Sequence, residues 1–393
     1  MEDETKMSDN VLILGAGASH DAGIPLLAGF VDKMLDFTLR GKADGVPLDE
    51  HSLKIFQRAY EIRKELDGYH GRAAFDDRNI EDILSILAFN AMGGAKKDKE
   101  KLAWIEDAIV KTIELSCTVK ENHDGKSRVP GDVYQHLWYY LLKWCKDKNS
   151  KFPSIITFNY DLVLERSLFH LLDNVVYNLT NNPIPFQEIR LEYHYTHLPF
   201  REYKIDYREH VRANERPMPG TSYQEIEVQN PLHIDLLKMH GSLNFPRRPV
   251  TDLQIPITRP VESPYILPPI FDKLKSSGAE GIWKCALGIL RKAKNIVFVG
   301  YSLPRTDIYM QYFLKSALGP NIDLNRIFVF DPVLFKDGPE NQEMRNRYSS
   351  CFAPQLVGRI VFDPPTIRDS PPVSGSLHHF MSLFTRKDQG ILF

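Results

Sequence analysis

The sequence predicts an α/β fold with a mostly parallel, Rossmann-like sheet and a large helical insertion. Short, mainly apolar runs such as Val11–Leu14 and Asn295–Val299 end in glycine-containing or polar turns, as strands buried on both faces do. Helical periodicity follows several of these runs, and such alternation is typical of a parallel α/β sheet. Residues 31–149 interrupt the pattern, because they carry almost no strand signal and repeat apolar residues at helical spacing.

The predicted elements follow in chain order. Strands are expected at residues 11–14, 154–158, 236–239, 295–299 and 326–330. Helices are expected at residues 31–39, 52–66, 80–92, 102–119, 133–146 and 162–172. These elements predict a discontinuous α/β domain of residues 1–30 plus 150–365, a helical insertion at 31–149, an irregular insertion at 177–231 and a C-terminal tail at 366–393.

The length and composition are those of an ordinary globular protein. The 393 residues suggest two or three structural units, at about 150 residues per domain. The chain is 43% hydrophobic, 25% charged and 11% aromatic, which excludes a disordered, collagen-like or coiled-coil protein. A formal net charge of −2 gives the whole chain no attraction to nucleic acid or to an anionic membrane. We therefore expect neither as a direct partner.

The cysteines indicate a reduced, cytoplasmic protein. No two of them are close enough in sequence to form a CxxC pair, which argues against a zinc ribbon and a disulfide framework. They are Cys117, Cys145, Cys285 and Cys351. Residues 1–10 are acidic and polar and lack the apolar core of a secretory signal. No apolar stretch approaches the roughly 18 residues that a membrane-spanning helix needs.

The first motif with chemical potential runs from Gly15-Ala16-Gly17-Ala18-Ser19 to Gly23-Ile24-Pro25. It lies on a predicted strand-to-helix turn, where backbone N–H groups and a helix N-terminus can hold a pyrophosphate. A dehydrogenase GxGxxG fingerprint needs glycine at position 20, and this chain has His20. The alternative is a glycine-rich turn without a ligand.

Two further motifs follow predicted strands. Thr157-Phe158-Asn159-Tyr160-Asp161 lies at the carboxyl end of a strand, where ligands bind in open parallel sheets. The amide of Asn159 suits a ribose hydroxyl or a positioned water, but Asn159 and Asp161 are also candidate caps of the next helix. His240 precedes Gly241 after another short strand, although a lone histidine is more often structural than catalytic.

The last two motifs end the predicted strands near the C-terminus. Gly300-Tyr301-Ser302-Leu303 combines a glycine, which allows close backbone approach, with a serine hydroxyl. Asp331 follows the final clear strand and could accept a hydrogen bond from an adenosine ribose. It is equally suited to cap a turn before Pro332.

The order of these motifs resembles the sirtuin family, whose pattern is GAGxSxxxGIP, TQNID, HG and GTSL. The first motif keeps its full spacing from Gly15 to Pro25. The other matching residues are Thr157, Asn159, Asp161, His240, Gly241, Gly300, Ser302 and Leu303. Sirtuin deacylases also carry two CxxC pairs and a DFR-like segment after GIP. This chain has neither, since Pro25 precedes Leu26-Leu27-Ala28-Gly29.

These departures are similar to the sirtuin-like domains of bacterial anti-phage systems, which hydrolyse NAD⁺. Residues 79–87, residues 265–269, Trp283 and the sequence GYSLP also resemble that family. The resemblance implies a sirtuin-like NAD⁺ glycohydrolase in which Asn159 holds the ribose and a water, and His240 is the general base. It implies NAD⁺ contacts from Gly15, Ala16, Gly17, Ser19, Asp21, Ile24, Pro25, Asp161, Gly300, Ser302, Leu303 and Asp331.

Two other functions stay open, an NAD-dependent protein deacylase and a non-catalytic protein that binds NAD or ADP-ribose and acts by assembly. The resemblance implies a defence effector that depletes NAD⁺, that forms a homo-oligomer, and that works with a partner such as a HerA-type ATPase or an Argonaute-like protein. No metal is expected, because the segment that holds Glu192, His194 and His197 does not have helical periodicity. NAD⁺ is expected as a substrate.

Overall fold

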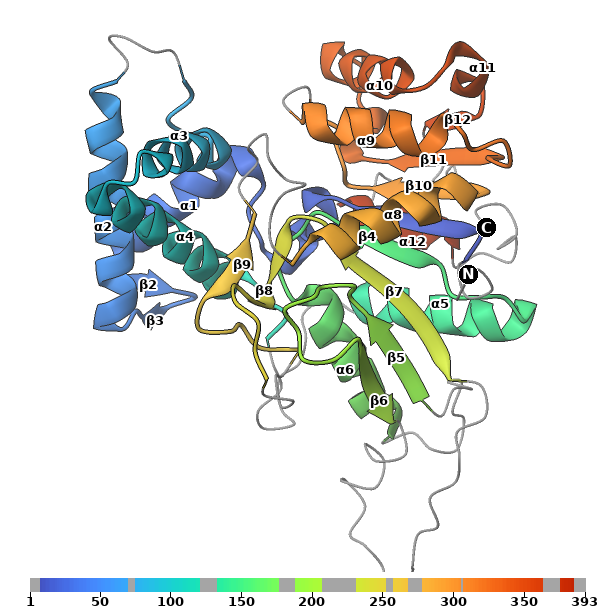
Figure 1. Cartoon of the computed structure of the whole chain (residues 1–393), viewed down its shortest axis with the longest axis horizontal. Helices are drawn as coiled ribbons and strands as arrows, with labels where there is room; N and C mark the ends of the chain where they lie inside the picture. The colour runs from blue at the N-terminus through green and yellow to red at the C-terminus, as the bar shows by residue number, and fades with distance from the viewer. Residues whose placement is uncertain are drawn as a thin grey trace, which may run out of the picture.

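The computed structural model is an α/β protein built on one mostly parallel sheet (Figure 1). It describes residues 8–69, 75–120, 133–176, 188–206, 231–251, 257–267, 278–304, 307–362 and 375–384. The sheet has 8 strands in the order β12-β11-β10-β1-β4-β7-β5-β6, and all neighbours are parallel except β5 and β6. The strands are β1 (Asn10–Leu14), β4 (Ser154–Thr157), β5 (Glu188–Glu192), β6 (Glu202–Asp206), β7 (Leu232–Lys238), β10 (Asn295–Val299), β11 (Arg326–Phe330) and β12 (Ile360–Phe362).

Helices cover both faces of this sheet. In Figure 1, α8 lies in front of the strands, whereas α5, α6 and α12 lie behind them. The helix α8 packs on α9 and β7, and α12 packs on β10, β11 and α5. The helices of this part are α5 (Val133–Lys148), α6 (Val163–Val176), α8 (Glu280–Lys292), α9 (Ile308–Leu318), α10 (Pro339–Cys351), α11 (Pro354–Val357) and α12 (Ser376–Phe384).

A helical lobe, residues 27–116, extends to one side of the sheet (Figure 1). It contains α1 (Leu27–Arg40), α2 (Glu50–Asp67), α3 (Ile80–Met92) and α4 (Lys96–Ser116), with a small ribbon of β2 (Lys42–Ala43) and β3 (Val46–Pro47). Polar caps start two of these helices, since Asp49 accepts from the Ser52 N–H at 2.8 Å and Asn79 from the Glu81 N–H at 2.9 Å. The four helices predicted here are confirmed.

A second hairpin connects the sheet with the lobe. It pairs β8 (Gly241–Pro246) with β9 (Pro264–Ile266) and lies between the two parts in Figure 1. Just beyond β8, Arg247 forms an ion pair with Glu106 of α4 at 2.8 Å. Burial raises the pKa of Glu106, and the nearby Arg247 opposes that rise.

The centre of the sheet is apolar on both faces. Val11, Leu12 and Ile13 of β1 are fully buried, as are Ile155 and Ile156 of β4. Each such side chain contributes roughly 1.5–3 kcal/mol when it leaves water, so short apolar strands are stable only with helices on both sides. The predicted strands at 11–14, 154–158, 295–299 and 326–330 are confirmed to within a residue, and β7 begins four residues before the expected 236.

The structure corrects three of the predicted boundaries. The segment expected to be irregular, 177–231, contains β5 and β6, which extend the sheet beyond β7. The helix α5, expected within the insertion at 31–149, packs on α6 and α12 and therefore covers the sheet. The expected C-terminal tail, 366–393, contains α12, whose Phe380 and Phe384 are fully buried.

The strand β1 lies between β10 and β4, where the order of the strands reverses. From β1 the chain forms β4, β5, β6 and β7 on one side of β1, and it then crosses to β10 on the opposite side. Ligands in open α/β sheets bind at the carboxyl ends of the strands where the order reverses in this way. No helix in the described part of the chain is long and apolar enough to cross a membrane.

Candidate functional site

Four motif loops converge at the carboxyl ends of four neighbouring central strands. They follow β10, β1, β4 and β7, which are neighbours in that order. Parallel pairing aligns the ends of these strands, because Leu14 lies opposite both Val299 and Thr157, and Thr157 lies opposite Lys238. Motifs that are up to about 285 residues apart in sequence, from Gly15 to Gly300, therefore lie side by side.

The loops after β1 and β10 touch through glycines. The Gly17 N–H donates to the Gly300 carbonyl at 2.9 Å. Gly300 has a left-handed φ of 63°, and a Cβ there would lie 2.4 Å from the Ala18 nitrogen. A Cβ on Gly15 would lie 2.5 Å from the Gly300 oxygen. Because such contacts are far inside van der Waals distance, only glycine permits this approach of the two backbones.

The glycine loop differs from the expected pyrophosphate cradle. The N–H groups of Gly15, Gly17, Ala18 and Ser19 all donate within the protein, to the carbonyls of Val299, Gly300, Gly15 and Ala16. The loop continues as two short 3₁₀ turns, Ala16–Ala18 and His20–Ala22, and α1 begins only at Leu27. The helix N-terminus expected directly after the loop is therefore not present there. Ala16 is exposed at the loop surface.

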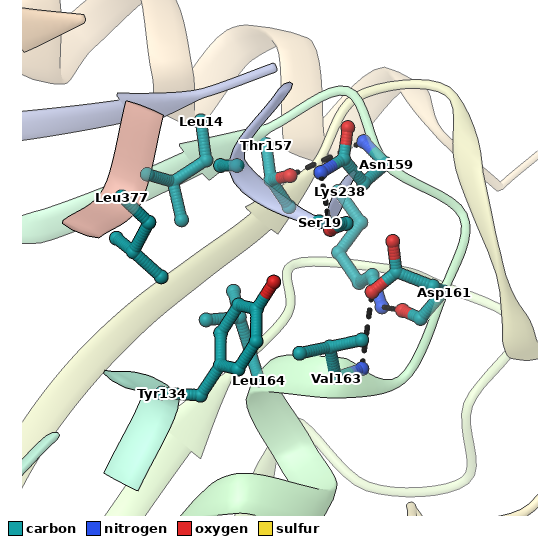
Figure 2. Close-up of a pocket in the computed structure, with 11 residues that line it drawn as sticks. Leu14, Ser19, Tyr134, Thr157, Asn159, Asp161, Val163, Leu164, Lys238 and Leu377 are labelled. Carbon is teal, nitrogen blue, oxygen red and sulfur yellow. Dashed lines mark hydrogen bonds between the residues drawn. The ribbon is translucent and has the colours of Figure 1, made fainter. Parts of the chain in front are cut away.

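Asn159 joins the glycine loop to the loop after β4. Its Nδ2 donates to the Gly15 carbonyl at 2.9 Å and to the Ser19 hydroxyl at 2.7 Å (Figure 2). Its own N–H donates to the Thr157 hydroxyl at 3.2 Å. Asn159 is therefore not a helix cap. Asp161 is one, because its carboxylate accepts from the Val163 N–H at 3.0 Å where α6 begins.

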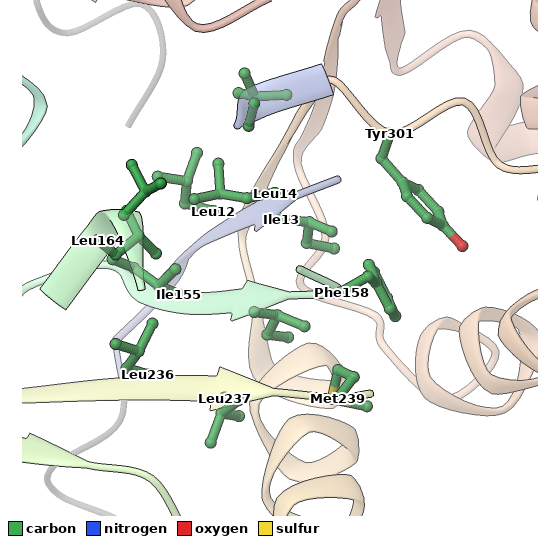
Figure 3. Close-up of a cluster of buried hydrophobic side chains, with 14 of the residues drawn as sticks. Leu12, Ile13, Leu14, Ile155, Phe158, Leu164, Leu236, Leu237, Met239 and Tyr301 are labelled. Carbon is green, nitrogen blue, oxygen red and sulfur yellow. The ribbon is translucent and has the colours of Figure 1, made fainter. Parts of the chain in front are cut away.

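His240 lies two residues after β7, beside the rings of Phe158 and Tyr160. The imidazole is 7% exposed and meets Phe158 edge-on at a centroid distance of 5.1 Å. Phe158 in turn stacks on Tyr301 at 4.6 Å, and Figure 3 shows both rings at the carboxyl ends of the strands. The Leu267 N–H donates to the His240 carbonyl at 2.8 Å. Phe158, Tyr160 and Tyr301 were not predicted as site residues, although all three lie inside the motifs.

A buried ion pair supports the same loop. Lys238, 1% exposed, donates to the Glu165 carboxylate at 2.9 Å and also to the Asp161 carbonyl. Glu165 lies on α6 and is fully buried. The pair connects β7 and α6 to the loop that carries Asn159. Sequence reasoning missed it, and the signal was a lysine within the otherwise apolar end of a predicted strand.

A small cavity with a mixed polar and apolar lining lies beside Asn159. The side chains of Ser19, Thr157, Asp161 and Lys238 line one side, and those of Tyr134 and Leu377 line the other (Figure 2). Its free volume is about 10 Å³, which is room for about one water molecule and too little for a nucleotide. Ala16 and Ser302, in the loops that follow β1 and β10, are exposed outside this cavity.

The remaining predicted contacts have varied surroundings. Asp21 is 2.8 Å from the His378 Nδ1 of α12. Asp331 accepts from the Val333 N–H at 3.0 Å, which agrees with the alternative of a turn cap, and burial raises its pKa. Leu303 is fully buried with a left-handed φ of 48°. Ile24 is buried and Pro25 partly buried, where the adjoining Ala22 carbonyl accepts from the Thr118 N–H at 2.7 Å.

Comparison of the sequence with models of known protein families found no match, and comparison with curated proteins found none either. The geometry of the site and the motif resemblance are therefore the basis for a functional proposal.

Proposed function

We propose that this protein is a sirtuin-like NAD⁺ glycohydrolase that cleaves the bond between nicotinamide and ribose. One observation carries the proposal: the Asn159 amide bridges Gly15 and Ser19 of the glycine loop. That bridge lies at the carboxyl edge of the sheet, with His240 at the end of the next strand. It combines an amide, an imidazole and a glycine-rich approach in one place, as a ribose-binding hydrolytic site requires.

The chemistry needs few protein groups. Nicotinamide leaves as a neutral amine from a pyridinium, so no general acid has to protonate it, and the transition state is oxocarbenium-like as in glycoside hydrolysis. The water oxygen bonds to the ribose carbon, the carbon–nitrogen bond breaks with its electron pair moving to nicotinamide, and the water proton passes to His240. Imidazole suits this role because its ordinary pKa is near neutrality.

The surrounding groups position the ribose and the attacking water, and they exclude bulk water from the site. Two hydrogen bonds fix the Asn159 amide through its Nδ2, so its Oδ1 is the atom proposed to accept from a ribose hydroxyl or the attacking water. The rings of Phe158 and Tyr160 lie beside the imidazole, at centroid distances of 5.1 and 6.3 Å, and exclude bulk water from it. Because most N–H groups of the glycine loop are engaged internally, the phosphates are met at the loop surface, by Ala16 and by the Ser302 hydroxyl.

The biological role that follows is depletion of cellular NAD⁺, as an effector of anti-phage defence. Such an activity has to be restrained until infection, which is the reason for proposing a homo-oligomer and a separate partner such as a HerA-type ATPase. The motif resemblance supports this part of the proposal.

Nicotinamide release tests the proposal. Purified protein is incubated with NAD⁺, with and without an acetylated peptide, and we expect release that does not depend on the peptide. Release only with peptide would show a deacylase, and NAD⁺ binding without release would favour a non-catalytic assembly protein. Asn159→Ala and His240→Ala should each lower the rate by at least about 100-fold, the usual contribution of a positioned acid–base or electrostatic group.

A matched control uses Asn295, whose Nδ2 donates to the Asn10 side chain at 2.9 Å at the opposite end of β1 and β10. Asn295→Ala removes the same kind of hydrogen bond away from the site and should leave the rate within a few-fold of wild type. If Asn159→Ala and His240→Ala both keep the wild-type rate in a folded protein, the assignment of the site is wrong.

A further inference from the structure

A second cluster of reactive side chains lies between the sheet and α8. His194 follows β5, Asp235 lies in the middle of β7, and Cys285 lies on α8. One donor atom from each residue lies within 4.8 Å of the other two. The spacing of these three residues in the sequence does not predict a cluster. From the sequence alone, a different metal-binding set was considered, namely Glu192, His194 and His197. The structure instead directs the His197 ring toward the Tyr195 hydroxyl, at 3.3 Å.

The backbone is arranged to bring these residues together. Asp235 lies opposite Glu192 in the parallel pairing of β7 with β5, and His194 lies two residues after Glu192. His194 has a left-handed φ of 54°, uncommon for a residue with a side chain. On α8, a Cβ at Gly281 would lie 2.6 Å from the His194 carbonyl, so this glycine lets the helix approach closely. Cys285, one turn later, lies on the same helix face.

Each inner donor is held by an outer partner. The His194 Nε2 lies 3.0 Å from Asp235 Oδ1, while its Nδ1 lies 3.5 Å from Glu192 Oε1. Glu192 is itself fixed by Arg201 at 2.6 Å, and the Ser154 hydroxyl donates to the other Asp235 oxygen at 3.1 Å. Metal-binding histidines usually have a carboxylate beside the ring nitrogen that does not bind the metal, and metal-binding carboxylates usually accept a further hydrogen bond. His194 and Asp235 have these partners in Glu192 and Ser154.

We propose that His194, Asp235 and Cys285 bind a divalent transition-metal ion, with zinc as the preferred ion. Imidazole nitrogen, carboxylate oxygen and thiolate sulfur are all zinc ligands, and three protein ligands leave a fourth position for water. Zinc bonds of about 2.0–2.3 Å place donors about 3.5 Å from one another. The His194 and Asp235 donors, 3.0 Å apart, already satisfy this, and only a donor pair near the 4.8 Å limit has to close, by about 1 Å. Binding replaces the Cys285 thiol proton, which passes to solvent.

This site is separate from the proposed NAD⁺ site. Asp235 is five residues before His240, which corresponds to about 16 Å along an extended strand. The ion would attach the β5–β6 ribbon and α8 to the central strand β7 and would keep one coordination position open to water. The assignment departs from the expectation of no metal, and it does not depend on the proposed glycohydrolase activity.

Cobalt is the probe, because a Co²⁺–thiolate bond gives a charge-transfer absorption band that a carboxylate or imidazole site lacks. The full chain is stripped with a chelator, the chelator is removed, and Co²⁺ is added. We expect the band to saturate at one equivalent of Co²⁺ and to disappear when Zn²⁺ is added. Zn²⁺ should also raise the unfolding temperature of the stripped protein.

Paired variants identify the ligands. Cys285→Ser should abolish the thiolate band, and His194→Gln should weaken Co²⁺ binding at least tenfold, with folding verified by circular dichroism. Cys351→Ser and His233→Gln change the same residue types elsewhere and should leave the titration unchanged. Absence of a thiolate band at stoichiometric Co²⁺, or a band that persists in folded Cys285→Ser, overturns the proposal. In that case His194 is only a hydrogen-bonded bridge between Glu192 and Asp235.

Discussion

At the scale of single residues, the buried pair Lys238–Glu165 supports both the fold and the loop that carries Asn159. Neither side chain reaches solvent, and Lys238 also donates to the Asp161 carbonyl, two residues after Asn159. Removing one charge of a buried pair costs about 3–5 kcal/mol, because the other charge is left without a partner in a medium of low dielectric constant. The same change also releases the loop that positions Asn159.

We therefore expect Lys238→Met to lower the free energy of unfolding by about 3–5 kcal/mol. The double variant Lys238→Met/Glu165→Gln should recover much of that loss, since no buried charge remains. Urea denaturation measures both. The exposed pair Lys96–Glu100, 3.7 Å apart with the lysine 93% exposed, is the control, and Lys96→Met should cost less than about 0.5 kcal/mol. Equal losses in the single and double variants would contradict this reasoning.

Among the elements, α12 shows how a terminal helix can support a site that lies at the start of the chain. Phe380 is fully buried and meets Phe330 of β11 edge-on at 5.4 Å. At the beginning of the helix, Ser376 lies against the glycine loop, since a Cβ on Gly17 would be 3.1 Å from its hydroxyl. Packing of α12 on the sheet therefore also holds the loop after β1.

Phe380→Ala should lower the free energy of unfolding by about 3–5 kcal/mol, from lost burial and the cavity that remains. Phe89 on α3 is 53% exposed, so Phe89→Ala should change stability by less than about 0.5 kcal/mol. Chemical denaturation of the two variants in parallel gives the comparison. A loss below about 1 kcal/mol for Phe380→Ala would mean that α12 is not an integral part of the fold.

The elements that sequence reasoning found and missed differ in one physical respect. The strand Val11–Leu14 is apolar throughout, so its burial is visible in the sequence. In β5, Glu188 and Glu192 are buried as ion pairs with Arg190 and Arg201, and a charged residue in the sequence does not reveal a partner. The short helix α12 follows a Pro/Ser-rich segment and was missed because nothing in that segment indicates a helix start.

The same limit applies to the site. The convergence of the motif loops was predictable, because parallel strands place their carboxyl ends at one edge. The hydrogen-bond partner of each polar group in these loops was not predictable, because a motif does not show whether a backbone N–H points at a ligand or at a carbonyl of the protein. The Gly17 N–H donates to the Gly300 carbonyl, and the Asp331 carboxylate caps a turn. Neither hydrogen bond is visible in the sequence.

For the whole molecule, the junction between the lobe and the sheet predicts how stability depends on pH. Arg166 of α6 pairs with Glu114 of α4 at 2.9 Å, and Cys117 follows α4 directly. Cys117 is 1% exposed and donates to the Val119 carbonyl at 3.3 Å. Burial is the main cause that raises the pKa of the Cys117 thiol from 9.0 to about 11, and the nearby Asp161 carboxylate adds to it.

This shift should appear as a loss of stability in alkali. Below pH 9.0 the Cys117 thiol is protonated in both states, and between 9.0 and about 11 only the unfolded chain releases the proton. The free energy of unfolding therefore falls as pH rises through this window, by about 3 kcal/mol for two pKa units. Urea denaturation at several pH values should show a slope that is smaller by up to one proton in Cys117→Ala. Cys145→Ala should act similarly, because burial raises the pKa of Cys145 to about 12. If the slopes of wild type and both variants coincide, these thiols are not buried at the junction and in α5 as described, and water reaches them in the folded protein.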